Sequence, residues 1–479
     1  MEMKATAFGR MATLLRPVLE NIYLDYFFFS VPVRLLWDNW QKMNGEQKDP
    51  GDSTDFLVPV LASGSTFTEQ TLPDYFGLPT HKSLSGVSAL WFRAYNMIWN
   101  EWFRDENLQD SVPFNTDDGP DATADYVVLP RGKRHDYFTS CLPFPQKGAA
   151  VSLPLGVSAP VSGLISASGV PTFNATGYTN KAMRVNDIVA GDVMLASPVG
   201  GAASDISWNN PQLDFTSGLA DLSTATAATI NELREAFQVQ RLYERDARGG
   251  SRYTEILRSH FGVVSPDARL QRPEYLGGGS SRVNVNSVAS TNFNASTSLA
   301  LGELGAFATF GGSGIGFRRS FTEHCVLIGM VCARADITYQ QGMERMWSRR
   351  TRFDFYWPAL AHLGEQAVLN KEIFYQATSD DDDVFGYQER YAEYRYKPSR
   401  VTGLMRSSSS APLDSWHLAQ EFASLPLLNA EFIVEAPPIS RIVAVSGEQS
   451  AHFLLDVFFQ YKCTRPMPVF GVPGLIDHF

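Results

Sequence analysis

The chain has 479 residues and a formal net charge of −11, and aromatic residues make up 12% of it against 19% charged residues. This acidic balance excludes a protein whose whole surface binds nucleic acid, so any such contact must be a local basic patch. A composition rich in aromatic residues and poor in charge is typical of proteins with large buried interfaces.

The first predicted element is a strand in the aromatic run NIYLDYFFFSVPVRLLWDNW, residues 21–40. A membrane helix needs about 20 apolar residues with few charges, whereas Asp25 and Arg34 interrupt this run and Pro32 breaks it. We therefore expect no membrane insertion. Alternate residues of a strand point to opposite faces, and both faces are largely apolar here, so the strand should be covered on both sides. A short helix closed by Gly45 is expected next.

Residues 86–108 carry a helical pattern with two aromatic faces. Trp91 and Tyr95 fall on one face, and Trp99 and Phe103 fall on a second. An exposed helix would keep one face polar, so this helix is expected to be clamped between two surfaces. Deep burial within one chain and a contact between subunits both fit the pattern.

The middle of the chain changes character. Residues 148–228 are rich in small and polar residues with few charges, which predicts a long excursion of short strands and turns. Thr229 and Glu232 then form a capping-box pattern that predicts a helix, ending near Gly249. Residues 277–317 are again rich in Gly, Ser and Asn.

The last third of the chain contains short candidate strands, rich in β-branched and aromatic residues and bounded by Pro, Gly or Ser. They cover residues 322–339, 388–396, 430–436, 440–446 and 451–463. Compact enzymes rarely carry structureless loops longer than about 15 residues. Strands at both chain ends with long excursions between them therefore predict an assembly built on an antiparallel β-core.

No pattern of catalytic residues is present. The sequence lacks a GxSxG elbow, a GxxxxGK[ST] phosphate loop and an HExxH pair, and its eight histidines are scattered. The four cysteines match no zinc spacing and are expected to be free thiols. We therefore expect no enzymatic activity, no catalytic residue and no cofactor.

One dense carboxylate run is a weak candidate for calcium, which prefers several oxygen ligands. It comprises Asp380, Asp381, Asp382 and Asp383. The spacing of an EF-hand is absent, and a solvated acidic turn explains the same run.

Two stretches, 343–357 and 388–400, mix arginine with aromatic residues. Single-stranded nucleic acid is bound by this mixture, and so are protein partners. Both interpretations stay open here, and the acidic total favours contacts between subunits. The candidate residues are Arg345, Trp347, Arg349, Arg350, Arg352, Arg390, Tyr391, Tyr394, Arg395, Tyr396 and Lys397.

Long blocks of the sequence closely resemble the major capsid protein of the microviruses, in the gokushovirus branch. They include TAFGRMATLLRPVLENIYLDYFFFSVPVRLLWDNW, FRAYNMIWNEWFRDENLQ, LYERDARGGSRYTEILRSHFGVVSPDARLQRPEYLGGGSS, ADITYQQGMERMWSRRTRFDFYWPALAHLGEQAVLNKEI, DDDVFGYQERYAEYRYKPS and RPMPVFGVPGLIDHF. These blocks span nearly the whole chain and follow the family's order.

The resemblance implies a mainly β fold: an eight-stranded viral jelly roll, an antiparallel barrel or sandwich with long inserted loops and a few helices. Residues 1–479 would form one capsid-protein domain, with 148–228 as the variable surface insertion that forms protrusions in this family. It further implies a T=1 icosahedral shell of sixty copies around a circular single-stranded DNA phage genome.

The same resemblance implies the partners. These are other copies of the chain, the packaged DNA, a small basic DNA-binding packaging protein, and a host cell-surface receptor reached by the protruding loops. The protein would be found in the virion and assembled in the host bacterial cytoplasm. A jelly-roll protein that binds or acts on carbohydrate is the alternative, and it would need paired carboxylates or clustered histidines in a pocket.

The chain departs from the family pattern at its start. Family members usually carry an N-terminal arm and part of a strand before the TAFGR block, whereas Met1 lies only five residues before it. The arm is therefore expected to be missing, and the strand in residues 21–32 is expected to be the first complete one.

Overall fold

The computed structural model describes residues 1–151, 230–264, 271–291, 301–445 and 451–465, with four short strands between residues 172 and 196. The chain divides into two compact units. Met1–Lys147 and Glu244–Phe479 form the first, and Gly148–Tyr243 forms the second. The predicted insertion falls within the second unit. Its strands are β5 (Thr172–Ala175), β6 (Tyr178–Ala182), β7 (Arg184–Asn186) and β8 (Met194–Ala196).

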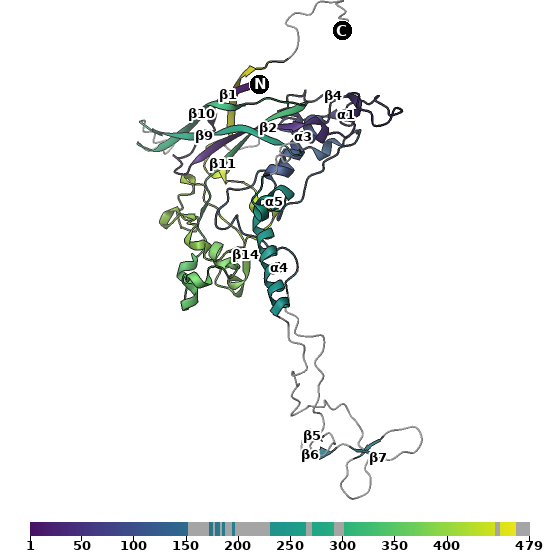
Figure 1. Ribbon diagram of the computed structural model, residues 1–479. Helices are drawn as coiled ribbons and strands as arrows, with labels where there is room; N and C mark the ends of the chain where they lie inside the picture. The colour runs from purple at the N-terminus through teal and green to yellow at the C-terminus, as the bar shows by residue number, and fades with distance from the viewer. Residues whose placement is uncertain are drawn as a thin grey trace, which may run out of the picture. The chain divides into compact units, whose positions relative to one another are not determined.

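The first unit is built on a six-stranded antiparallel sheet with strand order β11-β2-β9-β10-β1-β16. Figure 1 shows its strands drawn from both ends of the chain. This large, curled sheet confirms the predicted mainly β, jelly-roll-like fold. The strands are β1 (Glu2–Met11), β2 (Ile22–Pro32), β9 (Glu274–Ala289), β10 (Leu304–Arg318), β11 (Cys325–Ala335) and β16 (Phe453–Lys462).

Strand β1 corrects one expectation about the start of the chain. Residues 21–32 are not the first complete strand, because β1 pairs with β10 on one side and with β16 on the other. Pairing begins at Glu2, which lies opposite Arg318 and Lys462. The strand forms because its residues alternate: Ala5 and Ala7 are buried, whereas Lys4, Thr6 and Phe8 are exposed.

Strand β2 is covered on both faces, as its sequence predicts. Tyr26 and Phe28 belong to the main core within the sheet, together with residues of β1, β9 and β10. Phe29 and Val31 belong to a second core against helix α3 (Leu90–Ile98). The strand therefore joins two cores that face opposite sides of the sheet.

Helix α3 packs on two sides within its own chain, but Trp91, from one of its predicted aromatic faces, is about half exposed. Ala94 and Ile98 pack on the β2 side, whereas Phe92 belongs to a third core with Tyr126. A π-helical turn, Trp99–Phe103, continues the helix.

A buried ion pair fixes α3 to the loop that follows it. Arg93 donates from Nε and Nη2 to Asp121 at 2.8 and 2.6 Å, and from Nη1 to the carbonyl of Leu36 at 3.0 Å. Both charged side chains are fully buried. Burial alone would raise the pKa of Asp121, but hydrogen bonds from Arg93 and Tyr126 and the charge of Arg93 hold it below its usual value.

The remaining elements of the described residues are short, apart from two helices. Helices α4 (Ile230–Gly249) and α5 (Tyr253–Phe261) follow one another (Figure 1). Strands β13 and β14 pair antiparallel, and β12 and β15 pair parallel. The other bounds are α1 (Trp40–Met43), β3 (Ser65–Thr66), α2 (Leu72–Tyr75), β4 (Ser83–Leu84), β12 (Thr338–Tyr339), β13 (Glu365–Leu369), α6 (Asn370–Ile373), β14 (Val384–Glu389), β15 (Ser399–Arg400) and α7 (Ala430–Ile433).

The predicted helix before Gly249 is confirmed as α4, and the capping-box residue Thr229 lies outside the described residues. The strand prediction for residues 451–463 is confirmed as β16, and that for 322–339 divides into β11 and β12. In 388–396 the strand stops at Glu389.

Three strand predictions need correction. After Glu389, Tyr391 takes a left-handed conformation with φ of 65° and turns the chain into a 3-10 helix. Residues 430–436 instead begin with helix α7, because the side chain of Asn429 accepts the backbone N–H of Phe432 and caps a helical turn. Residues 440–445 lie in and after a 3-10 turn at Ile439–Arg441, and residue 446 lies outside the described residues. Local capping and turn geometry outweigh β-propensity at these places.

A glycine in β9 tests the tight packing of the sheet. A Cβ on Gly278 would overlap the carbonyl oxygen of Tyr26 in β2, whereas a Cβ on Gly305 in β10 would meet nothing within 4 Å. We expect Gly278→Ala to lower the free energy of unfolding in urea by about 2–3 kcal/mol. Gly305→Ala is the matched control and should change it by less than about 1 kcal/mol. Equal effects would show that the close approach does not limit stability.

The Arg93–Asp121 pair predicts a pH-dependent loss of stability. Arg93→Met leaves a buried carboxylate without its partner and should cost about 3–5 kcal/mol at pH 7. The exposed Arg10→Met is the control. In the native chain the lowered pKa of Asp121 contributes stability at pH values above the pKa that this carboxyl has in the unfolded chain. That contribution is lost as the pH falls through the pKa of Asp121 in the folded chain. Without Arg93 the carboxyl protonates more readily, so the difference between variant and native chain should shrink at pH 4. A constant difference would contradict this account.

Candidate functional site

The two predicted arginine and aromatic stretches lie against each other in the folded chain. Arg349 pairs with Glu393 at 3.3 Å, and the hydroxyl of Tyr391 donates to the carbonyl of Phe355 at 3.1 Å. Arg390 donates to the carbonyl of Phe353 at 3.4 Å. Residues 343–357 and 388–400 therefore form one lobe of the first unit.

Some candidates hold this lobe together. Arg345 donates to Glu372 at 3.1 Å and to the carbonyl of Ala367 at 2.6 Å. The guanidinium of Arg349 lies 4.2 Å from the ring centroid of Tyr394, and its side chain is only 12% exposed. The ring of Tyr391 is also buried. Because these groups already have partners inside the chain, they are poorly placed to bind another molecule.

A buried carboxylate organises that interior. Glu372 is 2% exposed and accepts the hydroxyl of Tyr137 at 2.8 Å as well as Arg345. Burial raises the pKa of Glu372 even though the charge of Arg345 acts to lower it. The group sits in a closed hydrogen-bonded network and serves the fold.

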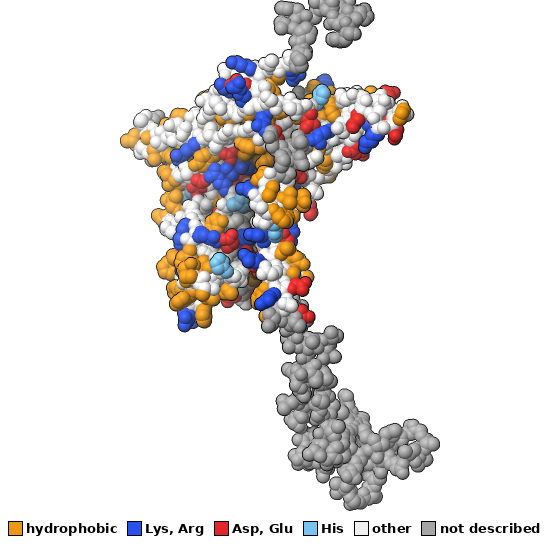
Figure 2. All heavy atoms as spheres, in the orientation of Figure 1, with side chains coloured by type: hydrophobic (Ala, Val, Ile, Leu, Met, Phe, Trp, Pro, Cys, Tyr) orange, Lys and Arg blue, Asp and Glu red, His pale blue; other side chains and the backbone are white. Residues whose placement is uncertain are grey.

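A second set of candidates lies at the surface. Trp347, Arg350 and Arg352 are exposed, and the Arg352 guanidinium lies 5.4 and 5.2 Å from the ring centroids of Phe353 and Trp357. Figure 2 shows hydrophobic side chains gathered at the lower left of the face drawn. We call the exposed residues of this stretch the aromatic surface. Its members are Trp347, Arg350, Arg352, Phe353, Phe355, Tyr356 and Trp357.

The remaining candidates adjoin the aromatic surface or lie further along the lobe, and the ring centroid of Tyr394 lies 6.3 Å from that of Tyr356. Arg395 forms an exposed ion pair with Glu389. Tyr394, Tyr396 and Lys397 are exposed and line a small cavity of about 110 Å³ beside Glu372. The predicted candidates therefore divide into interior braces, an aromatic surface and a cavity wall.

A large hollow in the first unit was not predicted. It measures about 1120 Å³ and lies beside β2, the π-helical turn and α5. Figure 2 shows Lys and Arg side chains gathered in the middle of the face drawn, below the sheet. The basic segment RGKRH, residues 131–135, forms part of its wall and was the available signal in the sequence.

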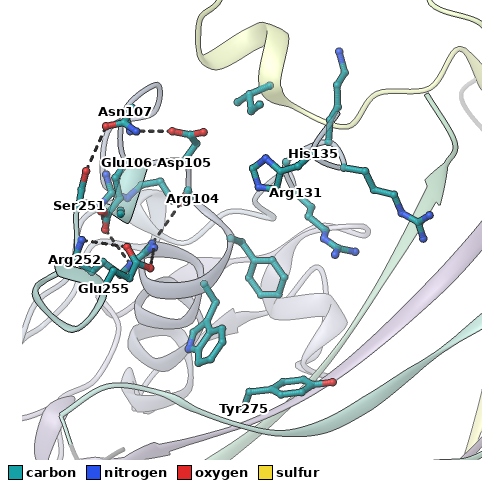
Figure 3. Close-up of a pocket in the computed structure, with 18 of the residues that line it drawn as sticks. Arg104, Asp105, Glu106, Asn107, Arg131, His135, Ser251, Arg252, Glu255 and Tyr275 are labelled. Carbon is teal, nitrogen blue, oxygen red and sulfur yellow. Dashed lines mark hydrogen bonds and ion pairs between the residues drawn. The ribbon is translucent and has the colours of Figure 1, made fainter. Parts of the chain in front are cut away.

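Aromatic rings form one side of the hollow, where Tyr275 is labelled in Figure 3. Trp102 and Tyr275 have ring centroids 6.2 Å apart and are each about two-fifths exposed. Phe27, Phe29 and Phe103 pack beside them. The rings come from the π-helical turn after α3, from β2 and from β9. These segments are far apart in the sequence, and only the folded chain brings them together.

Two polar walls flank these rings (Figure 3). In one, Arg252 pairs with Glu106 at 3.0 Å and Glu255 at 3.2 Å. In the other, Asp25 is buried and pairs with both Arg131 at 2.8 Å and Arg334 at 2.5 Å. Burial and the neighbouring charge of Arg131 lower the pKa of Arg334. One carboxylate thus faces two guanidinium groups.

The acidic run forms a capped turn. Asp381 is buried and accepts the backbone N–H groups of Gln376 and Thr378 at 2.9 and 3.2 Å. Asp382 pairs with Lys371 at 2.6 Å. Within the described ranges, no three His, Cys, Asp or Glu side chains are grouped to hold a metal ion.

No helix among the described residues has the length and apolarity to span a membrane.

Comparisons with known proteins identify the family. The chain matches the family model of the capsid protein (F protein) over residues 1–475. It is 46% identical to capsid protein VP1 of Bdellovibrio phage phiMH2K, over all of this chain and 90% of the relative. It is 41% identical to capsid protein VP1 of Chlamydia phage 1, over 97% of this chain and 89% of the relative. For capsid protein VP1 of Spiroplasma virus 4 the identity is 36%, over 99% of this chain and 89% of the relative.

These relatives confirm the resemblance seen in the sequence, and they do not favour the carbohydrate alternative. The chain belongs to the F-protein family of microvirus major capsid proteins: it is a structural, non-enzymatic subunit of the virion that assembles into the capsid.

Proposed function

We propose that the chain forms a T=1 icosahedral shell of sixty copies around a circular single-stranded DNA genome, and that the aromatic surface is a contact between copies. The observation that carries the contact is the exposure of five rings within residues 347–357, from 43% for Trp357 to 72% for Trp347. Contiguous apolar surface of this kind marks interaction sites.

The chemistry of this surface favours protein over nucleic acid. Arg352 already lies over two rings of its own chain, so its charge is partly engaged. Aromatic rings with arginine are enriched where protein interfaces gain most of their binding energy. In an assembling capsid, the neighbours of each subunit are other copies of the same chain. Another copy is therefore the expected partner of the aromatic surface.

The other partners follow from charge and family. A chain with a net charge of −11 does not neutralise a packaged genome by itself, which supports a separate small basic packaging protein. We assign receptor contact to protruding loops of the insertion 148–228, and assembly to the host bacterial cytoplasm. Residues 1–479 act together as one capsid-protein domain in this proposal.

Removing two rings tests the contact. Trp347→Ser with Phe353→Ser should leave the subunit folded, since both side chains are largely exposed, but should lower particle yield at least about tenfold. Particles are counted after gradient sedimentation by negative-stain microscopy, and subunit folding is checked by circular dichroism. Leu57→Ser with Tyr75→Ser removes apolar groups elsewhere that are at least as exposed, and is the control. Native particle yield in the ring variant would refute the contact.

Variants of Arg350 and Arg352 distinguish a contact with a neighbouring subunit from a contact with DNA. Both are exposed, whereas Arg349 is an interior brace whose loss would disturb the lobe. We expect Arg350→Ser with Arg352→Ser to lower particle yield while DNA per assembled particle stays at the native value. DNA is measured by absorbance and sequencing of purified particles. Native yield with less DNA per particle would instead place these arginines against the genome.

A further inference from the structure

The sheet of the first unit has two edge strands, β11 and β16, and they differ in how they are covered. In β11, Val326 and Ile328 are buried in the core against α3. Strand β16, the yellow strand beside β1 in Figure 1, pairs with β1 along its whole length. Its other edge pairs with no strand among the described residues. An unpaired edge is a template for a further strand, so β16 is the open side of the sheet.

Strand β16 lacks most of the features by which proteins protect an exposed edge, which are shortness, bulges, proline and many charges. It has ten residues, contains no proline and keeps one unbroken register from Phe453 to Lys462. Its sequence, FLLDVFFQYK, carries one carboxylate and one ammonium group. Phe458 on one face is 62% exposed, and Phe459 on the other face is 52% exposed. Both faces therefore present apolar surface next to the free edge.

We propose that β16 pairs antiparallel with β16 of a second copy across a twofold axis, so that two six-stranded sheets join into one. This inference rests on the proposed function, because an icosahedral shell has twofold axes, and a twofold contact joins the same patch on both copies. The contact is separate from the aromatic surface, whose residues lie within 347–357. It commits to one register of the two strands.

The two charges of β16 select that register. Asp456 and Lys462 are exposed, and their even spacing places both side chains on one face of the strand. Lys462 lies opposite Glu2, but Glu2 pairs with Lys4 at 3.1 Å. In an antiparallel pair, Asp456 opposite Lys462 of the second copy also sets Lys462 opposite the other Asp456. One register, centred on Phe459, therefore neutralises the charges of both strands, and opposite charges in facing positions stabilise a sheet.

The backbone fits the same register. The N–H of Ala12 donates to the carbonyl of His452 at 2.8 Å, so the even-numbered residues of this segment are those that hydrogen-bond to β1. The odd-numbered residues from 453 to 461 direct their N–H and C=O groups to the free edge, because the direction alternates along a strand. In the proposed register Phe459 lies opposite its own copy, and Val457 lies opposite Tyr461. Outward groups thus meet outward groups, whereas a shift of one residue would lose these pairs.

The side chains across the axis are compatible. The two Phe459 rings face each other at the centre. Val457 faces Tyr461, an aromatic and β-branched pair of the kind that stabilises antiparallel sheets. On the other face, Phe458 lies opposite Gln460. Pairing therefore covers apolar surface on both faces that a single subunit leaves exposed.

Charge reversal tests the register with purified full-length subunits. Asp456→Lys gives β16 two cations, and Lys462→Asp gives it two carboxylates. We expect each variant alone to self-associate at least about tenfold more weakly than the native subunit, because like charges then face each other twice. An equimolar mixture should regain association to within about threefold of native, since cations of one copy face carboxylates of the other. Sedimentation velocity at low salt measures the association.

Lys4→Asp is the matched control. Lys4 is exposed on the same face of the sheet, but it lies in β1, one strand away from the free edge. This variant should self-associate like the native subunit, and mixing it with Asp456→Lys should not restore association of the latter. Thermal unfolding verifies that each variant is folded. Lys462→Gln removes the charge without setting a carboxylate beside Glu2, and it should weaken association less than Lys462→Asp.

A disulfide tests the centre of the contact in assembled particles. A Cys463→Ser background removes the exposed native thiol. In this background Phe459→Cys should form a cross-linked dimer on oxidation, because facing residues of a hydrogen-bonded antiparallel pair have Cα atoms about 5.5 Å apart, which suits a disulfide. Phe8→Cys replaces an exposed ring of β1 and should stay monomeric. The dimer is detected on a denaturing gel without reductant.

Four outcomes overturn the inference: a strictly monomeric native subunit, native association by both charge-reversed variants, no recovery in their mixture, or no cross-link through Phe459→Cys. Weak association of both variants without recovery would make a different segment of the neighbouring copy the occupant of the edge. Particle formation by the native chain is measured in parallel. Particles alongside any of these outcomes reject the β16 pairing and leave the proposed function standing, whereas an absence of particles rejects the proposed function itself.

Discussion

The burial of strand β2 on both faces is the constraint on which the rest of the first unit depends. One face carries Tyr26 and Phe28 into the core within the sheet, and the other carries Phe29 into the core against α3. Two separate hydrophobic cores are thereby attached to a single strand. Asp25 is the only charged residue of β2, and burying it requires partners, which Arg131 and Arg334 provide.

That requirement links packing to surface chemistry. The arginines that neutralise Asp25 also line the hollow, so the stability of the sheet and the charge of the hollow depend on the same residues. Elsewhere in the chain, Arg93 and Arg349 are enclosed by carboxylates and rings and serve the fold. Whether an arginine braces the protein or meets another molecule depends on its partners and exposure, not on its neighbours in sequence.

The arrangement suits a capsid subunit. The aromatic surface offers apolar area that one subunit cannot bury by itself, and a second copy can cover it. The hollow presents cations and aromatic rings in a different part of the same unit.

The sequence alone determined the family, the mainly β fold, the lack of an enzymatic pattern and the two-sided burial of β2. These depend on long matching blocks and on the local alternation of residues, which a strand converts directly into buried faces. It also located the arginine and aromatic stretches, but it could not divide them into braces and exposed groups.

Only the tertiary structure decided that division, because burial and ion pairing join residues far apart in the chain, as in Arg345 with Glu372. The hollow depends on Trp102, Arg131 and Tyr275, which meet only when α3, the following loop and β9 pack together. Residues 430–446 have strand-like composition, yet the cap at Asn429 and the turn after Pro438 outweigh it. The composition of a segment indicates which secondary structures it can form, and its contacts in the fold determine which of them it forms.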